Sequence, residues 1–265
     1  MYSPFRLAIK YLQYWISAKS GKGHGIHSPF VFDFVVSVLN DKGNYYCYEP
    51  VEALRKEMLK TDEWVTILDL GAGSRKGTSN QRMVSTIAKT ALKPRKYSQL
   101  LFRLANYLKS STIFELGTSL GITTCYLASV QHNAKVITME GVPGIAVKAA
   151  DNFSRMGFDN IRLIEGNFDE TLPPMLKQTG KVDFAYIDGN HRCEPTLRYF
   201  EQIFPHLQSG GCLVFDDIHW SREMETAWNT IKSDKRVLLT IDLFFIGLVF
   251  INPDIKIKQD FIIRF

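Results

Sequence analysis

Apolar residues follow two different patterns along this chain, and each pattern predicts its own kind of element. Helical spacing predicts helices over residues 4–20, 28–40, 50–60 and 80–109, the last interrupted near Pro94. Short continuous apolar runs then predict strands at 112–116, 135–139, 161–165, 182–187 and 211–215. The stretches between them predict helices near 121–131, 144–157, 170–178 and 194–208.

The regular alternation of strand and helix predicts the fold class. Buried parallel strands form continuous apolar runs, and such alternation implies right-handed βαβ units. The last two runs, 236–244 and 246–252, have no room for a helix between them, which predicts an antiparallel hairpin. We therefore expect an α/β, Rossmann-like, doubly wound sheet that is mostly parallel, with a C-terminal antiparallel hairpin and a mainly helical N-terminal region.

Two domains are expected from the change of pattern. Residues 1–97 would form the helical region, as a substrate pocket or lid, and residues 98–265 the α/β domain. The apolar hairpin is expected to be a central part of the sheet, with a homodimer contact as the alternative. The N-terminal aromatic residues are expected in the core rather than in a substrate pocket (Tyr11, Tyr14, Trp15, Phe30, Phe32, Phe34).

Composition narrows the class of protein. Of the 265 residues, 45% are hydrophobic, as in ordinary globular proteins. The four cysteines have no CxxC or zinc-ligand spacing, which favours reduced thiols in the cytoplasm. The longest apolar run, residues 243–251, is far shorter than the roughly 20 residues of a membrane helix, and the N-terminus lacks the pattern of a signal peptide. A soluble cytoplasmic protein without a membrane partner is expected.

The net charge of +5 is unevenly distributed. No acidic residue lies between Asp69 and Glu115, and nine lysines and arginines do. Such a segment could contact nucleic acid or an anionic substrate. A solvated helical face is the favoured interpretation, because aromatic residues are not interleaved with the basic ones.

Two glycine-rich turns compete for the role of ligand-binding loop. The first, residues 66–79, is not followed by a second strand with a terminal acid, and its Lys76-Gly77-Thr78 does not fit a P-loop. The second, residues 112–124, leads into a well-formed helix, and a strand ending in Glu140 follows at the spacing expected for an acid that binds ribose hydroxyls. The second turn is therefore predicted to bind a nucleotide-like cofactor, and the first to belong to the N-terminal region.

Acidic residues end two later strands. One strand ends at Asp188, with His191 three residues on, and the next ends at Asp216-Asp217. If these strands are neighbours, three carboxylates and an imidazole converge where open α/β sheets bind ligands. Clustered carboxylates favour a hard divalent cation such as Mg²⁺, or Mn²⁺ or Ca²⁺, and His191 could act as general base. The alternative is that these residues only cap a turn. His219 belongs either to the pocket wall or to packing.

The motifs IFELGTSLGITTCYLA, VITMEG, IRLIEGNFDETLP, VDFAYIDGNH and LQSGGCLVFDDIHW together resemble the class I S-adenosylmethionine-dependent methyltransferases. The resemblance covers about residues 98–252 and is strongest to the metal-dependent O-methyltransferases of the catechol and macrolide-sugar types. It implies transfer of a methyl group from S-adenosylmethionine to a hydroxyl of a small molecule. Residues 1–97 match neither type, so the resemblance does not identify the acceptor.

The resemblance also implies roles for individual residues. Glu115, Gly117, Ser119 and Gly121 would line the methionine part of the cofactor, Glu140 would bind the ribose, and Asn167 and Phe168 would flank the adenine. Asp188, also a cofactor-binding candidate, stands with Asp216 and Asp217 at the metal-ligand positions, and His191 at that of the base.

Two other classes of function remain open from the sequence. A nucleic-acid methyltransferase is suggested by the basic segment, but no Asn-Pro-Pro-Tyr-type motif or RNA-binding module accompanies it. A cofactor-binding scaffold, or a hydroxylase-like relative without methyltransferase activity, is the third class. The acid cluster argues against an inert scaffold.

Overall fold

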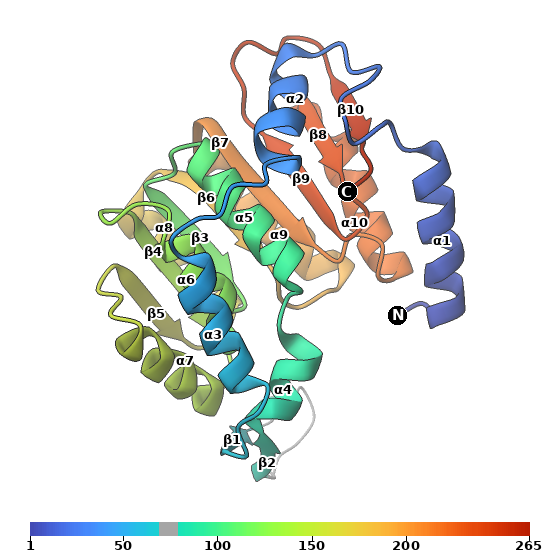
Figure 1. Ribbon diagram of the computed structural model, residues 1–265. Coiled ribbons are helices and arrows are strands. Elements are labelled where there is room, and N and C mark those ends of the chain that lie inside the picture. Colours follow the sequence, from blue (N-terminus) through green and yellow to red (C-terminus); the bar gives the residue numbers. More distant parts are fainter. Residues whose placement is uncertain (69–78) are drawn as a thin grey trace. The chain divides into compact units, whose positions relative to one another are not determined.

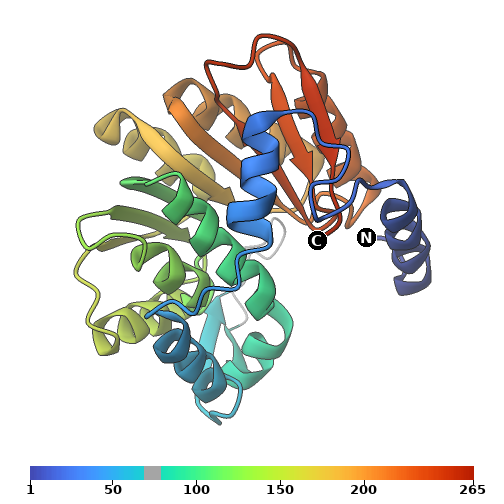
Figure 2. The ribbon, with the colours of Figure 1, turned by 45° about the horizontal axis from the view of Figure 1, so that its top comes forward.

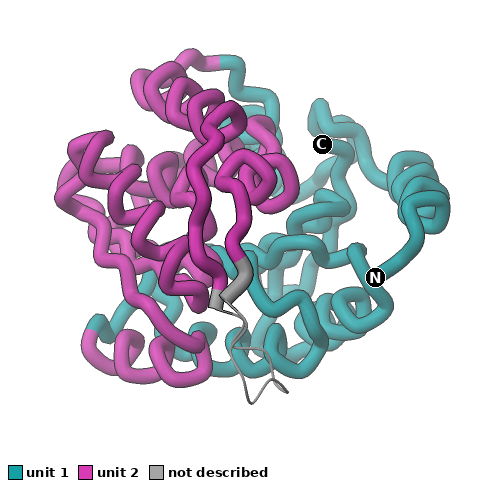
Figure 3. The backbone as a smooth tube through the Cα atoms, turned by 90° about the horizontal axis from the view of Figure 1, so that it is seen from below, with its two compact units in different colours: residues 1–42, 179–265 teal, residues 43–178 magenta. Residues whose placement is uncertain are grey.

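The computed structural model describes residues 1–68 and 79–265 and divides the chain into two compact units (Figure 3). Unit 1 comprises residues 1–42 and 179–265, and unit 2 comprises residues 43–178. The elements of unit 1 are α1 (Pro4–Ser17), α2 (Pro29–Phe34), a π-helical turn (Val35–Leu39), β6 (Val182–Ile187), α9 (Cys193–Ile203), a 3₁₀ turn (Phe204–His206), β7 (Leu207–Asp216), α10 (Arg222–Ser233), β8 (Leu239–Asp242), β9 (Ile246–Phe250) and β10 (Gln259–Ile262).

Unit 2 contains the other strands and helices (Figure 1). They are α3 (Tyr48–Met58), β1 (Trp64–Leu68), β2 (Ser79–Met83), α4 (Val84–Ala91), α5 (Arg95–Tyr107), β3 (Thr112–Leu116), α6 (Ile122–Ala128), β4 (Lys135–Glu140), α7 (Pro143–Arg155), β5 (Ile161–Glu165) and α8 (Phe168–Thr179). Strands β3, β4 and β5 pair in parallel in that order. Strands β1 and β2 form a separate antiparallel hairpin.

The strands of unit 1 run in the order β10-β8-β9-β7-β6. Strand β6 pairs with β7, and β10 with β8, in parallel, whereas β9 is antiparallel to both of its neighbours. Mostly parallel strands alternating with helices, followed by an antiparallel hairpin, confirm the predicted fold class. Because β8 and β9 are fully buried and paired on both sides, the hairpin is a central part of the sheet.

Burial explains why the strands were predictable. In each of β3, β4, β6, β8 and β9 all residues but at most one are buried, which matches their continuous apolar runs. Helix α2 crosses the face of β9, where Phe30 and Phe34 both make edge-on contacts with Phe250 (Figure 2). The N-terminal aromatic residues were expected in the core, and this is wrong for Trp15 and Phe32, whose side chains are 42% and 47% exposed.

Residues 80–83, the start of the segment 80–109 that was expected to be helical, instead belong to strand β2. Most of the first glycine-rich turn, residues 69–78, lies outside the described residues. Within the described part of the chain, no helix is both long and apolar enough to cross a bilayer. All four cysteines are free thiols, as their spacing predicted.

Candidate active site

The second glycine-rich turn joins β3 to α6 in unit 2, and its backbone is held against the end of β4. The amides of Gly117 and Thr118 both donate to the carbonyl oxygen of Met139, at 3.0 and 3.1 Å. Gly117, Ser119 and Gly121 have φ angles of 104°, 49° and 79°. A chain with three such left-handed positions presents backbone rather than side chains to a ligand, which is what a close-fitting cofactor loop requires.

Ser119 and Glu140 connect the turn to the acid at the end of β4. The Ser119 amide donates to Glu140 Oε2 at 2.8 Å, and the Val142 amide donates to Oε1 at 3.0 Å. Burial raises the pKa of Glu140, although these backbone hydrogen bonds partly oppose the shift. Each carboxylate oxygen can accept a further hydrogen bond, as a ribose diol would require.

Two observations fit a polar group bound beside this turn. The Ser119 hydroxyl is buried and has no hydrogen-bond partner among the described residues. A Cβ added at Gly141 would meet only the carbonyl of Gly166, at 3.9 Å, so open space lies between the ends of β4 and β5. A buried hydroxyl without a partner is costly, and a cofactor oxygen or nitrogen would satisfy it.

Glu115 lies deeper than the rest of the predicted cofactor set. Its side chain is fully buried, and its carboxylate accepts hydrogen bonds from the hydroxyls of Thr124 and Thr138, the latter at 2.6 Å. These contacts join β3, α6 and β4 beneath the turn. The geometry therefore gives Glu115 a role in fixing the loop.

Asn167 and Phe168 begin α8, directly after β5. The Asn167 side-chain oxygen accepts from the Asp169 amide at 3.1 Å, and its carbonyl accepts from Glu170 and Thr171. Asn167 thus stabilises the start of the helix. The Gly166 amide donates to the Glu140 carbonyl at 2.9 Å, so both residues follow a loop bound to the end of β4.

The acid cluster lies in unit 1, where β6 and β7 are neighbours as the sequence required. Their parallel register pairs Ile187 with Phe215, which places Asp188 and Asp216 side by side at the carboxyl ends. Asp188, His191 and Asp216 each offer a ligand atom, and these atoms all lie within 4.8 Å of one another. His191 Nε2 is 3.6 Å from Asp188 Oδ1.

Asp217 is not part of this group of three. Its backbone has φ of 53°, and its amide donates to the Phe245 carbonyl at 2.7 Å. The structure thus brings together two of the three predicted carboxylate ligands with the predicted base.

His219 lies in a hydrogen-bonded network rather than at the cluster. Its Nε2 is 2.8 Å from Asp242 and its Nδ1 is 3.2 Å from Glu225, and its ring stacks on Phe244. Burial alone would lower the pKa of His219, but the hydrogen bonds and charges of Asp242 and Glu225 raise it. Sequence reasoning left His219 between pocket wall and packing, and it missed Asp242, which sits at the end of a strand like the predicted acids.

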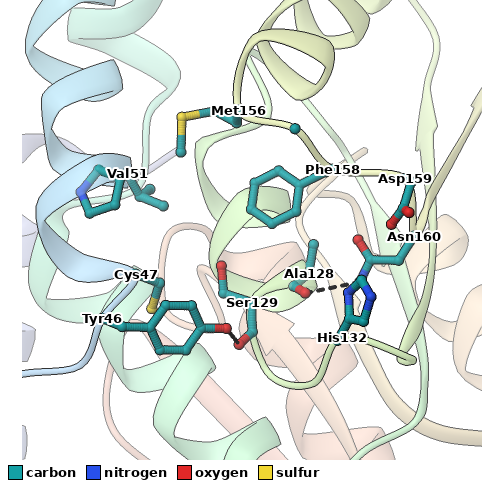
Figure 4. Close-up of a pocket in the computed structure, with 12 residues that line it drawn as sticks. Tyr46, Cys47, Val51, Ala128, Ser129, His132, Met156, Phe158, Asp159 and Asn160 are labelled. Atoms are coloured by element: carbon teal, nitrogen blue, oxygen red, sulfur yellow. Dashed lines mark hydrogen bonds between the residues drawn. The ribbon is translucent and has the colours of Figure 1, made fainter.

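A cavity of about 390 Å³ in unit 2 contains none of the predicted site residues (Figure 4). It lies near the starts of β4 and β5 and is bordered by Val51, Met156 and Phe158. The Tyr46 hydroxyl donates to the Ser129 carbonyl, and the Asn160 amide donates to the Ala128 carbonyl, as the dashed lines show. Ligands of open α/β sheets bind at the carboxyl ends of the strands, so this cavity is not the expected cofactor site.

The basic segment is not a uniformly solvated face. Among its described residues, Arg103 is only 8% exposed and donates to the Tyr48 hydroxyl at 3.3 Å. Lys96 lies over the Tyr97 ring at 5.7 Å. Part of the segment's charge is therefore bound within unit 2 and is less accessible to a nucleic-acid backbone.

Sequence comparison connects this geometry to known proteins. Residues 114–218 match the family described as "Methyltransferase domain". An uncharacterised protein of Acanthamoeba polyphaga mimivirus is 26% identical over 149 residues, covering 51% of this chain and 66% of that protein. A protein-L-isoaspartate O-methyltransferase of Methanococcus aeolicus is 30% identical over 103 residues, covering 38% of this chain and 44% of that enzyme. The chain thus matches less than two thirds of the length of these relatives.

Solved structures resemble a larger share of the chain. The S-adenosylhomocysteine-bound methyltransferase PaMTH1 of Podospora anserina has a TM-score of 0.60 at 15% identity, covering 85% of this chain and 97% of that one. An O-methyltransferase of Bacillus cereus in complex with S-adenosylhomocysteine has a TM-score of 0.54 at 19% identity, covering 83% and 97%. Together with the match over residues 114–218, these likenesses show that the chain has the Rossmann-like fold of class I methyltransferases.

Proposed function

We propose that this protein transfers the methyl group of S-adenosylmethionine to a hydroxyl of a small molecule, with a divalent cation and a histidine base assisting. The observation that carries the proposal is the group formed by Asp188, His191 and Asp216, whose ligand atoms lie within 4.8 Å of one another. The solved structures it resembles include proteins named as O-methyltransferases, which favours an oxygen acceptor.

The donor set fits a cation. Two carboxylates at the ends of adjacent strands repel each other unless a positive charge lies between them. Carboxylate oxygens suit Mg²⁺ or Mn²⁺, and an imidazole nitrogen shifts the preference toward Mn²⁺ and later transition metals. We also propose Asp217, one residue beyond Asp216, as a further ligand, although its carboxylate is not among the three ligand atoms within 4.8 Å of one another.

Different residues of the chain would bind the cofactor, bind the cation and accept the proton. Glu140 and Ser119 would hold the ribose and a polar group of the cofactor, and Asp188 and Asp216 would hold the cation. His191 Nε2 would take the proton that the acceptor hydroxyl loses as the new carbon–oxygen bond forms and the carbon–sulfur bond breaks. When bound, the cation lowers the pKa of the acceptor hydroxyl, and the cofactor supplies the electrophilic methyl group.

Calorimetric titration with S-adenosylhomocysteine, with and without Mg²⁺ or Mn²⁺, tests the cofactor and cation together. We expect micromolar binding that tightens when the cation is present. Absence of binding under both conditions would remove the methyltransferase proposal. Full turnover in metal-free buffer would remove the cation from it.

Substitutions separate the roles of the cluster. Asp188→Asn and Asp216→Asn should lower Mn²⁺ affinity, measured by electron paramagnetic resonance, and reduce turnover. If His191 is the base, His191→Ala keeps Mn²⁺ affinity and loses turnover; if it is a ligand, Mn²⁺ affinity falls as well. His132→Ala, at an exposed histidine of unit 2, is the matched control and should change neither quantity.

A further inference from the structure

Helix α1 carries apolar residues on two opposite faces, and the rest of unit 1 covers only one of them. Leu7, Tyr11, Tyr14 and Ala18 pack against Phe244 and Phe245, and the Tyr11 and Phe244 rings meet edge-on at 5.0 Å. The opposite face has the same 4-3-4 spacing, shifted by two residues. Its members are Phe5, Ile9, Leu12 and Ile16, which we call the α1 stripe.

The α1 stripe is open to solvent. Phe5 is 77% exposed, Leu12 58% and Ile16 70%, and Ile9 is exposed as well. At ~150–200 Å² for a large apolar side chain, the exposed fractions amount to roughly 400–500 Å². A patch of that size is comparable to the largest apolar patch of a typical monomer, which is often an interaction site.

The charged residues in the segment that contains the α1 stripe have one sign. Residues 1–32 contain Arg6, Lys10, Lys19 and Lys22 and no acidic residue. Arg6 and Lys22 are exposed, whereas Lys10 is paired with Glu225. Arg264, from the segment after β10, lies over the Trp15 ring at 5.4 Å and adds a cation beside the helix.

We propose that α1 docks this protein on an anionic lipid surface, with the α1 stripe inserted among the acyl chains and its basic neighbours on the headgroups. A helix with Phe, Leu and Ile on one face and Lys and Arg beside them lies in the plane of the interface and does not span the bilayer. The other face of α1, which contains Tyr11 and Tyr14, packs against the rest of unit 1. This proposal adds a peripheral membrane contact to a sequence from which no membrane partner was expected.

A second copy of the chain fits the α1 stripe less well. A stable dimer buries about 800 Å² on each partner, and the α1 stripe offers roughly 400–500 Å². Two copies of α1 would also bring the exposed basic residues of this segment close to one another. An anionic bilayer satisfies both the apolar area and the charge.

Vesicle flotation tests the proposal with the full chain. We expect wild-type protein to float with vesicles of phosphatidylglycerol and phosphatidylcholine, and at least about fivefold less with phosphatidylcholine alone, because anionic headgroups supply part of the attraction. Leu12→Glu should reduce binding at least about tenfold, since it places a charge in the apolar layer. Gln13→Glu, an exposed position of the same helix beside the stripe, carries the same change of charge and should bind within about twofold of wild type.

A second variant removes apolar area without adding charge. Phe5→Ser combined with Ile16→Ser should weaken vesicle binding as Leu12→Glu does, while both variants keep the wild-type melting temperature and affinity for S-adenosylhomocysteine. Equal flotation of wild type and Leu12→Glu, equal binding to both kinds of vesicle, or no binding to either would overturn the proposal. So would sedimentation of the wild type as a dimer that Leu12→Glu dissociates, which would assign the α1 stripe to a second copy.

Discussion

Gly121 shows at the scale of one residue why the second glycine-rich turn needs glycine. Its φ is 79°, and an added Cβ would lie 2.4 Å from Phe153 Cε1. Gly121→Ala therefore combines a backbone penalty of about 1–2 kcal/mol with a steric overlap, and we expect the free energy of unfolding to fall by about 3 kcal/mol or more. Urea denaturation measures this loss.

Gly157→Ala is the matched control for that prediction. Gly157 has φ of 72° with no atom within 4 Å of an added Cβ, so only the backbone penalty applies. We expect a loss of about 1–2 kcal/mol. Equal losses in the two variants would mean that Phe153 moves aside freely and that overlap does not restrict the turn.

Glu140 gives a prediction for pH. Burial raises the pKa of this carboxyl, so protonation begins at a higher pH than for an ordinary glutamate. Only the ionised form accepts two hydroxyl hydrogen bonds, and affinity for S-adenosylhomocysteine should therefore fall as the pH is lowered through the raised pKa. Calorimetry between neutral and mildly acidic pH would follow this loss.

Glu140→Gln tests the same group at constant pH. The substituted amide cannot accept from both the Ser119 and Val142 amides, and hydrogen bonds to a charged group contribute about 1.5–3 kcal/mol each, so we expect affinity to fall roughly 10- to 100-fold. Its binding should vary less with pH than that of the wild type. An unchanged pH profile in the variant would assign the dependence to another group.

Sequence spacing was sufficient to place Glu140 beside the turn but not to describe Glu115. The number of residues between the ends of the two predicted strands identifies Glu140 as an acid near the loop. The hydrogen bond from the Ser119 amide to Glu140 confirms that Glu140 lies there. Whether an acid points toward a ligand or into the core depends on its neighbours across the sheet. Thr138, which accommodates Glu115 in the core, lies 23 residues further along the chain and forms no motif with it.

At the scale of elements, Asp242 joins a strand, a helix and a turn. Its buried carboxylate accepts from Trp228 Nε1 at 3.1 Å and from the Phe244 amide at 2.9 Å, and lies 2.8 Å from His219 Nε2. Asp242→Asn places an amide group where only acceptors fit, so the free energy of unfolding should fall by about 2–4 kcal/mol. Asp254→Asn, at an exposed aspartate, should change it by less than about 0.5 kcal/mol.

The predicted boundaries were accurate where an element is buried on both faces. Strands 112–116 and 182–187 were predicted to the residue, because a buried strand is a continuous apolar run between polar turns. Strand 161–165 was also predicted to the residue, although none of its residues is buried. Strand β10 was missed: its four residues alternate in burial at the edge of the sheet, and so short a pattern does not stand out. Strand β2 was missed because its SNQRM sequence is polar and its pairing partner is 11 residues away along the chain.

At the scale of the whole molecule, order along the sequence predicted which motifs belong to the fold but not how the chain divides. Unit 1 joins residues 1–42 to residues 179–265, a long-range association that no local pattern contains. The Tyr2 hydroxyl, for example, donates to Glu225 at 2.7 Å across 223 residues. Such contacts depend on complementary surfaces, and a single sequence does not display them.

The proposed function makes a final prediction for the intact chain, because the proposed reaction uses both the cofactor and the cation. If the cation tightens S-adenosylhomocysteine binding by some factor, the same factor must appear when the cofactor product is added to the cation titration. We expect cooperative binding of about 5- to 100-fold, and a melting temperature that rises more with both ligands than the sum of the separate shifts. Asp216→Asn should abolish the extra rise in melting temperature seen with both ligands, while the rise with S-adenosylhomocysteine alone should remain. Strictly additive shifts in the wild type would show that the cofactor and the cation bind independently, and the cation would then have no part in the proposed reaction.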